Sequence, residues 1–209
     1  MFYEERPSEA LRFGDVIRGF VVSSARVDSP QPSSPPEEYG IEVEVPEYSV
    51  ILTPCCSIRG GCLSLSPLLH VLPTFFDNPY LAEDLTRVNR PIRPQQSLPP
   101  AVWERMDAEE KAQRFDMARP LGYAFNSIFV YPPHDLLPSY QLNKRGGPIE
   151  TQCFMVDFAR ACRVLSEGVH NPQQSPLQTK ILELTVQARA ELREKMADYF
   201  GRVPAEDLT

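Results

Sequence analysis

Side chains capable of metal binding or nucleophilic chemistry are concentrated in one short stretch of the chain. They are Cys55, Cys56, Cys62 and His70. Zinc is held by four such ligands at about 2.0–2.3 Å, so this set is a candidate zinc site. The stretch lacks a paired C-x-x-C, however, and adjacent side chains on an extended backbone point to opposite faces. The alternative is that Cys55 or Cys56 is a small buried apolar residue, as free cysteines often are.

Cys56 is also a candidate nucleophile. It follows a short apolar strand at a point where a turn can direct backbone N–H groups at a thiolate. Such a nucleophile needs a base, and His70 is the histidine of the same stretch. No protease signature surrounds Cys56, so the pair Cys56 and His70 is a candidate without an assigned reaction.

A third group of candidate residues is basic. Arg87, Arg90 and Arg93 form a short segment that could contact phosphates, and the alternative is a solvated loop. The formal net charge is −7, and the first 50 residues carry four Arg against ten Asp and Glu. Because an acidic surface opposes binding to nucleic acid and to anionic membranes, we expect neither as a partner.

The composition indicates a globular protein of the reducing cytoplasm. Of the 209 residues, 42% are hydrophobic, and the 22 prolines favour short elements joined by fixed loops. The five cysteines show no disulfide-framework spacing, and the N-terminus has no apolar stretch typical of a signal peptide. No apolar run approaches the roughly 20 residues of a membrane helix. We expect a cytoplasmic protein without a cofactor, zinc being the one alternative.

The first third of the chain has the patterns of several strands. Residues 16–22 are β-branched and aromatic, which predicts a first strand. Residues 39–45 alternate apolar and acidic side chains, which predicts that Ile41, Val43 and Val45 face the core. Residues 50–52 lack polar alternation, which predicts a central strand covered on both faces.

Further strands are expected on both sides of a helical segment. Residues 62–72 continue the first group of strands, and residues 123–131 and 152–165 predict the later ones. Between them, residues 78–85 predict a short helix, and residues 101–115 predict a longer one that follows two prolines. Strands separated by Pro and Gly turns are typical of a small antiparallel barrel or sandwich.

The last predicted element is a long amphipathic helix. Ser175 is a candidate N-cap, Pro176 suits the first helical position, and Gly201 is a candidate C-terminal stop. Its apolar residues recur at helical spacing, and the predicted stripe includes Leu177, Ile181, Leu184, Leu192, Met196 and Phe200. This stripe is expected to pack on the sheet or to form an interface with a partner or a second copy.

These elements predict one α+β domain over residues 1–209. The expected architecture is a small antiparallel β-barrel of the SH3-like kind, with a helical insertion and the C-terminal helix. The predicted parts are residues 11–75 for the first half of the barrel, 76–120 for the insertion, 121–166 for the remaining strands and 175–201 for the helix.

The run from Ser49 to Ile58 resembles a motif of small uncharacterised prokaryotic proteins, in which a strand ends in Ser/Thr-x-x-Cys-Asp-Ile. Thr53, Cys56 and Ile58 match this motif, whereas Ser57 replaces its Asp. Gly14-Asp15-Val16 further resembles the first strand of the MazF/PemK-like SH3 barrel. The resemblance implies a small β-barrel with added helices. The MazF-like resemblance also implies an RNA-cleaving toxin or a domain derived from one.

The sequence favours a non-enzymatic protein over an enzyme, because no complete catalytic set is present. We expect an interaction or adaptor subunit of a bacterial multi-protein system, such as phage defence or toxin–antitoxin. The expected contact elements are the C-terminal helix and the inserted helices. The alternatives are a ribonuclease-like enzyme on a MazF-type barrel, which would use Arg87, Arg90 or Arg93, and a zinc-binding protein.

Overall fold

A computed structural model describes most of the chain and divides it into two compact units. It describes residues 1–8, 10–18, 22–28, 38–60, 62–92, 98, 100–116, 122–144, 146–165 and 180–201. The first unit contains Met1, Tyr3–Leu68 and Ala159–Thr185. The second contains Phe2, Leu69–Phe158 and Val186–Thr209. Among the helices of the described residues, none is both long and apolar enough to cross a membrane.

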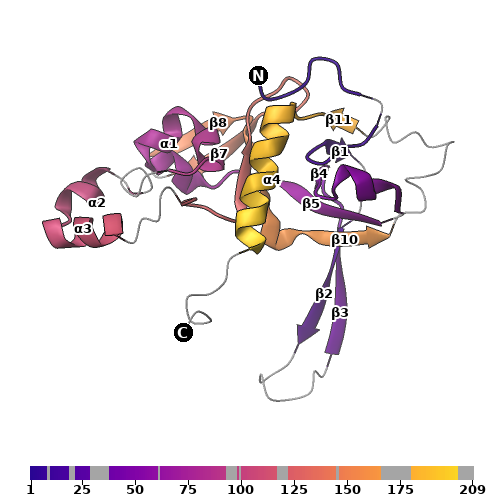
Figure 1. The fold of residues 1–209 in the computed structure, drawn as a ribbon, viewed down its shortest axis with the longest axis horizontal. Coiled ribbons are helices and arrows are strands. Elements are labelled where there is room, and N and C mark those ends of the chain that lie inside the picture. Colours follow the sequence, from indigo (N-terminus) through magenta and orange to yellow (C-terminus); the bar gives the residue numbers. More distant parts are fainter. Residues whose placement is uncertain are drawn as a thin grey trace. The chain divides into compact units, whose positions relative to one another are not determined.

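An antiparallel sheet forms the centre of the first unit (Figure 1). Its strands are β1 (Val16–Arg18), β4 (Tyr48–Ile51), β5 (Cys62–His70), β10 (Cys162–Leu165) and β11 (Lys180–Leu182). Their order is β11-β1-β4-β5, and β10 also pairs with β5. Every residue of β4 is buried, which confirms the central strand predicted at residues 50–52.

Apolar side chains from the sheet, from the turn after β4 and from the N-terminal segment form the core of the first unit. They are Leu11, Ile17, Ile51, Ile58, Leu63 and Leu65. The turn itself is a 3₁₀ helix, η1 (Cys55–Gly60). The buried hydroxyl of Thr53 accepts a hydrogen bond from Ser64 N at 2.6 Å, so this threonine joins the end of β4 to β5.

The described strands do not close into a barrel. No pairing among them joins β11 to β10, so the sheet of the first unit stays open. Of the strand predicted at residues 16–22, β1 confirms residues 16–18, Val22 begins the next strand, β2 (Val22–Asp28), and residues 19–21 lie outside the described residues. The mixed class of helices with antiparallel sheets is confirmed, and the SH3-like barrel remains a prediction.

Strands β2 and β3 (Glu38–Glu44) form a separate two-stranded sheet. Figure 1 shows this hairpin as a ribbon that extends away from β1, β4 and β5. The expectation that Val43 and Val45 face the core is wrong, because their exposed fractions are 61% and 73%, and the side chain of Ile41 lies outside the description. Alternation gives the period of a strand, but it does not show whether another layer covers the apolar face.

The second unit is built on the antiparallel pair β6 (Ile128–Tyr131) and β9 (Phe154–Asp157). Only the last four residues of the predicted strand at 123–131 are extended. The hairpin of β7 (Tyr140–Lys144) and β8 (Gly147–Thr151) lies between them in sequence. Gly146 and Gly147 at its turn have φ values of 101° and 117°, a backbone conformation that glycine adopts at little cost.

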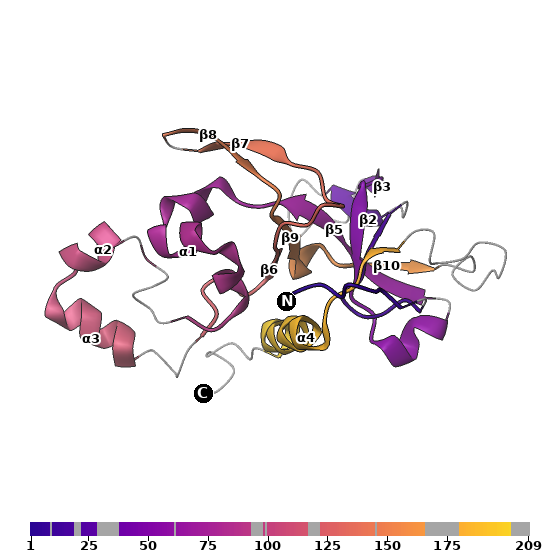
Figure 2. The ribbon, with the colours of Figure 1, turned by 90° about the horizontal axis from the view of Figure 1, so that it is seen from above.

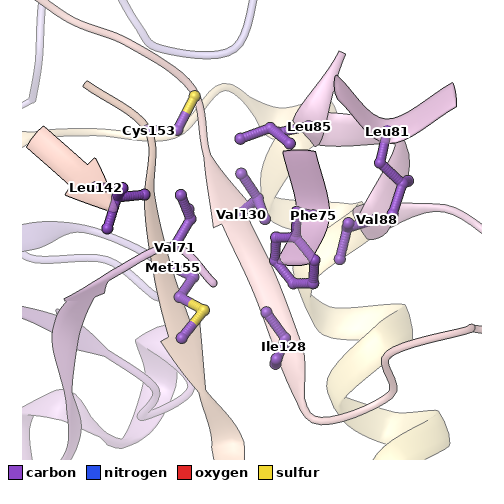
Figure 3. Close-up of a cluster of buried hydrophobic side chains, with 10 residues drawn as sticks. All are labelled: Val71, Phe75, Leu81, Leu85, Val88, Ile128, Val130, Leu142, Cys153 and Met155. Atoms are coloured by element: carbon purple, nitrogen blue, oxygen red, sulfur yellow. The ribbon is translucent and has the colours of Figure 1, made fainter. Parts of the chain in front are cut away.

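Three short helices supply much of the second unit's core. They are η2 (Pro73–Asp77), α1 (Pro79–Glu83) and η3 (Leu85–Asn89). α1 confirms the short helix predicted at residues 78–85, with Asn78 as its N-cap, although it ends two residues early. Figure 3 shows their apolar side chains directed at those of β6, β7 and β9. The cluster consists of Val71, Phe75, Leu81, Leu85, Val88, Ile128, Val130, Leu142, Cys153 and Met155.

The long helix predicted at residues 101–115 is divided into α2 (Pro100–Arg105) and α3 (Ala108–Asp116). The cause is a capping box. The Asp107 carboxylate accepts a hydrogen bond from Glu110 N at 2.8 Å, and Asp107 N donates to the Glu110 carboxylate at 3.1 Å. These two bonds start a new helix, so the predicted helix breaks there. Figure 2 shows α2 and α3 beyond α1, away from β6 and β9.

The C-terminal helix α4 spans Val186–Phe200, and its end before Gly201 is confirmed. Its predicted start is wrong, because Lys180–Leu182 is strand β11, paired with β1. Ile181 and Leu184 therefore precede the helix, and Leu177, Ser175 and Pro176 lie outside the described residues. Within α4, Leu192 is buried, Met196 is half-buried and Phe200 is exposed.

The buried side chain of Asn89 joins η3 to β6 in the second unit. Its amide nitrogen donates to Val130 O at 2.7 Å, and its amide oxygen accepts from Val130 N at 2.6 Å. The amide therefore satisfies both backbone groups of one strand residue, as a neighbouring strand would.

Replacing Asn89 by Ala should destabilise the second unit by about 2–4 kcal/mol, because it leaves a buried donor and a buried acceptor without partners. Urea denaturation with the slope held constant measures this loss. Asn143→Ala, at an exposed position in β7, is the control and should stay within about 0.5 kcal/mol of the wild type. Equal unfolding free energies for the Asn89 and Asn143 variants would contradict this role.

Candidate functional site

The strongest cluster of ionisable groups lies in the first unit, around the ammonium of Lys180 in β11. Its Nζ atom lies 2.8 Å from Asp15 Oδ2 and 2.7 Å from Glu183 Oε2. It also donates to the backbone oxygens of Ser8, at 3.1 Å, and Ala10, at 2.9 Å. The Lys180 side chain is only 2% exposed, so these acceptors replace water around its charge.

Glu183 receives more hydrogen bonds than Asp15. Its Oε2 atom accepts from Ser8 N at 2.6 Å and from Ser8 Oγ at 2.9 Å, and its Oε1 atom lies 3.2 Å from Arg12 Nε. Burial alone would raise the pKa of Glu183, but the hydrogen bonds from Lys180 and Ser8 outweigh it and lower the pKa to about 2.

Asp15 is less well compensated, although it is fully buried. Its Oδ2 atom accepts from Arg12 N at 2.7 Å and contacts Lys180, whereas Oδ1 has no hydrogen-bond partner among the described residues. Burial raises the pKa of Asp15 to about 6, against the opposing effect of Lys180. Two carboxylates share one ammonium, and because the pKa of Asp15 is the higher of the two, Asp15 takes up a proton before Glu183 as the pH falls.

A pair of carboxyl groups with widely separated pKa values is the pattern of acid–base catalysis. Here the geometry instead indicates a structural role. Asp15 has no exposed surface, and Lys180 and Glu183 are nearly as buried, so a substrate cannot reach the network as it stands. The network joins the ends of β1 and β11 to Ser8, Ala10 and Arg12 of the N-terminal segment. We therefore interpret it as the anchor of that segment.

The predicted cysteine cluster is only partly brought together. Cys55 and Cys56 are both exposed, so the alternative that either is a buried apolar residue is wrong. Cys55 Sγ accepts a hydrogen bond from Phe13 N at 3.3 Å, and Cys56 Sγ lies 3.8 Å from Ser57 Oγ. Within the part of the chain that the structure describes, no group of three metal-ligating side chains occurs.

His70 is separated from Cys62 by the length of one strand. The two residues are the ends of β5, and eight steps of about 3.3 Å place their backbones roughly 26 Å apart. They cannot bind one ion in this arrangement. The His70 ring is exposed and stacks on Tyr140, with 3.7 Å between ring centroids. The side chain of Cys62 lies outside the description, so the zinc site that would include it remains a prediction.

The predicted arginine segment is also divided. Arg87 Nη1 donates to Glu83 Oε2 at 2.5 Å and to Tyr80 O at 2.7 Å, and its guanidinium lies over the Tyr80 ring. Arg87 is thus held by α1, while Arg90 is exposed and Arg93 lies outside the described residues. The arrangement does not form a phosphate cradle from Arg87 and Arg90.

Sequence reasoning also missed a buried lysine in the second unit. Lys195 of α4 has no exposed surface, and its ammonium donates to Val88 O and lies 5.1 Å from the centre of the Tyr123 ring. Burial lowers the pKa of Lys195 to about 7, although Asp198 opposes this effect. The helical spacing of α4 gave no signal, because a lysine normally marks the solvent face.

Asp15, Lys180 and Glu183 were missed for a different reason. They are distant in sequence, and no spacing rule joins residues that meet only through the pairing of β1 with β11. Comparisons of the chain with protein-family models, curated proteins and solved structures found no match.

Asp15 should make the protein less stable as pH rises from about 4 to about 6. Its pKa is about 6 in the folded chain against an ordinary 3.8, so its contribution is present below pH 3.8 and is lost as pH rises through 6. At about 1.4 kcal/mol per pH unit, the loss is about 3 kcal/mol. In Asp15→Asn this decrease should be absent from urea denaturation between pH 4 and 7. Asp135→Asn, at an exposed position, should keep it.

Lys195 should act in a separate pH window and with the opposite sign. Because the folded pKa of about 7 lies below the ordinary 10.5, the unfolded chain binds the proton more tightly, and stability should rise between pH 7 and 10. Lys195→Met should remove most of this rise. Lys144→Met in β7 is the control and should retain it. A Lys195 variant with the wild-type pH dependence would show that the buried amine is not the cause.

Proposed function

We propose that this protein is a non-enzymatic interaction subunit and that the β2–β3 ribbon is its contact element. The proposed setting is the cytoplasm, in a bacterial multi-protein system such as phage defence or toxin–antitoxin. The observation that carries the proposal is the exposure of Val43 and Val45 on and beside a ribbon that pairs with no further described strand.

An isolated two-stranded hairpin is at best marginally stable in water, because it cannot bury an apolar face. The β2–β3 ribbon pairs along seven residues of each strand, from Val22 opposite Glu44 to Asp28 opposite Glu38. Near its base, Arg160 Nη2 contacts both carboxylate oxygens of Glu44, at 2.7 and 2.8 Å. Exposed valines on such a ribbon favour a protein partner that covers them.

The ionisable groups of both units support a non-enzymatic function. The groups with the most strongly shifted pKa values, Asp15, Glu183 and Lys195, are buried and bonded to their own chain. The exposed candidates, Cys56 and His70, each contact a neighbouring side chain of their own unit. Two alternatives remain predictions: a ribonuclease, which needs the SH3-like barrel, and a zinc-binding protein. No contact of the described residues favours either.

Exchanging both Val43 and Val45 for Glu should abolish partner capture without unfolding the chain, because both side chains are solvated. Native mass spectrometry of the tagged protein, alone and after recovery from its host, measures capture. Val186→Glu is the matched control, since Val186 and Val45 are both 73% exposed. The unfolding free energies of all variants should agree within about 0.5 kcal/mol. A wild-type monomer that captures nothing would reject the proposal.

A further inference from the structure

The outer edge of β3 is open among the described strands. β3 pairs with β2 along one side, and no described strand pairs with its other side. A strand edge presents backbone N–H and C=O groups that an extended segment of another chain can bind. Both units have other edges, but β3 also carries a side-chain pattern that selects what can bind.

That pattern is an alternation of exposed acidic and apolar residues. Glu42, Val43, Glu44 and Val45 are all exposed. Within β3, successive side chains point to opposite faces, so Glu42 and Glu44 lie on one face and Val43 on the other, and Val45 follows the end of the strand. An incoming strand would therefore meet carboxylates on one face and Val43 on the opposite face.

The carboxylates oppose pairing of β3 with a second copy of itself. If two β3 strands paired antiparallel about Val43, Glu42 of each would stand opposite Glu44 of the other. Like charges directly opposite each other destabilise a strand pair, whereas opposite charges stabilise it by roughly 0.2–1 kcal/mol. The same acidic residues that repel a second copy would attract a strand with Lys or Arg at every second position.

The molecule already contains one example of this pairing. Arg160 contacts Glu44 through both carboxylate oxygens, and both side chains are about half exposed, at 43% and 50%. A guanidinium therefore fits this face of the ribbon, and the interaction remains accessible to solvent. An exposed ion pair of this kind is weak, so an incoming basic side chain can displace it.

We propose that the outer edge of β3 binds an extended segment of a partner protein in which Lys or Arg alternates with apolar residues. This inference rests on the proposed interaction function and names the chemistry of the partner. Backbone hydrogen bonds would supply the affinity, and the alternation of charge and apolar side chains would supply register and selectivity. A seven-residue segment would match the length of β3.

Three synthetic peptides with a fluorescent label test the proposal on the full chain. The first alternates Lys with Val and Thr, the second has the same composition with its Lys residues grouped, and the third has Glu in place of Lys. Fluorescence anisotropy should show at least tenfold tighter binding of the first peptide than of the other two. Amide shifts confined to β2 and β3 should accompany it. Equal binding of the first two peptides would overturn the proposal.

A charge exchange at Glu42 separates selective peptide binding from unfolding and from non-specific binding. The Glu42→Lys variant should bind the Lys peptide at least tenfold more weakly than the wild type does. It should bind the Glu peptide more tightly than the wild type does. Glu47→Lys, the same exchange at an exposed position after β3, should keep the wild-type preference. Failure of the preference to reverse in Glu42→Lys, or a wild-type dimer lost in that variant, would also overturn the proposal.

The two proposals can fail separately. If the host partner is captured through Val43 and Val45 but no peptide binds, the interaction function stands and the strand-addition inference is wrong. If the wild type captures no host partner, the proposed function fails, whatever the peptides do.

Discussion

The arrangement of the first unit depends on one ammonium group shared between two buried carboxylates. Lys180 lies on β11, Asp15 precedes β1 and Glu183 follows β11, so the ion pairs join the edge of the sheet to the N-terminal segment. Removing Lys180 would leave two buried carboxyl groups without their shared cation, which is far more costly than losing an exposed ion pair. The position of Ser8 and Arg12 follows from that constraint, because both bind the same Glu183 carboxylate.

Much of the fold could be predicted because local pattern and burial agree. The apolar run at β4 is buried on both faces, and Gly201 follows the last residue of α4. Predictions were wrong where a local signal met a competing interaction. The capping box at Asp107 is a second local signal, and it divides a helix that the apolar spacing alone had joined. Pairing with β1 makes a strand of Lys180–Leu182 despite its helical spacing, because tertiary hydrogen bonds outweigh the small propensity differences on which sequence patterns rest.

The candidate site was less predictable than the fold. The sequence draws attention to Cys55, Cys56 and His70 because their side chains can bind metals or act as nucleophiles. Residue type alone does not show whether such side chains meet in one site. Asp15, Lys180 and Glu183 do converge, and the sequence conceals it because charged residues are by default assigned to the surface. The opposite error was made at Val43 and Val45. An apolar residue on a strand is expected in the core, and both side chains are exposed.

The bidentate contact of Asn89 has a further consequence for how the chain avoids aggregation. By satisfying both backbone groups of Val130, the amide seals part of the side of β6 that does not pair with β9. β6 is entirely buried and apolar, the kind of segment that recruits other chains when its backbone is accessible. One side chain thus shields an aggregation-prone strand of the second unit, and an inherited change at Asn89 would first be seen as insoluble protein rather than as lost binding.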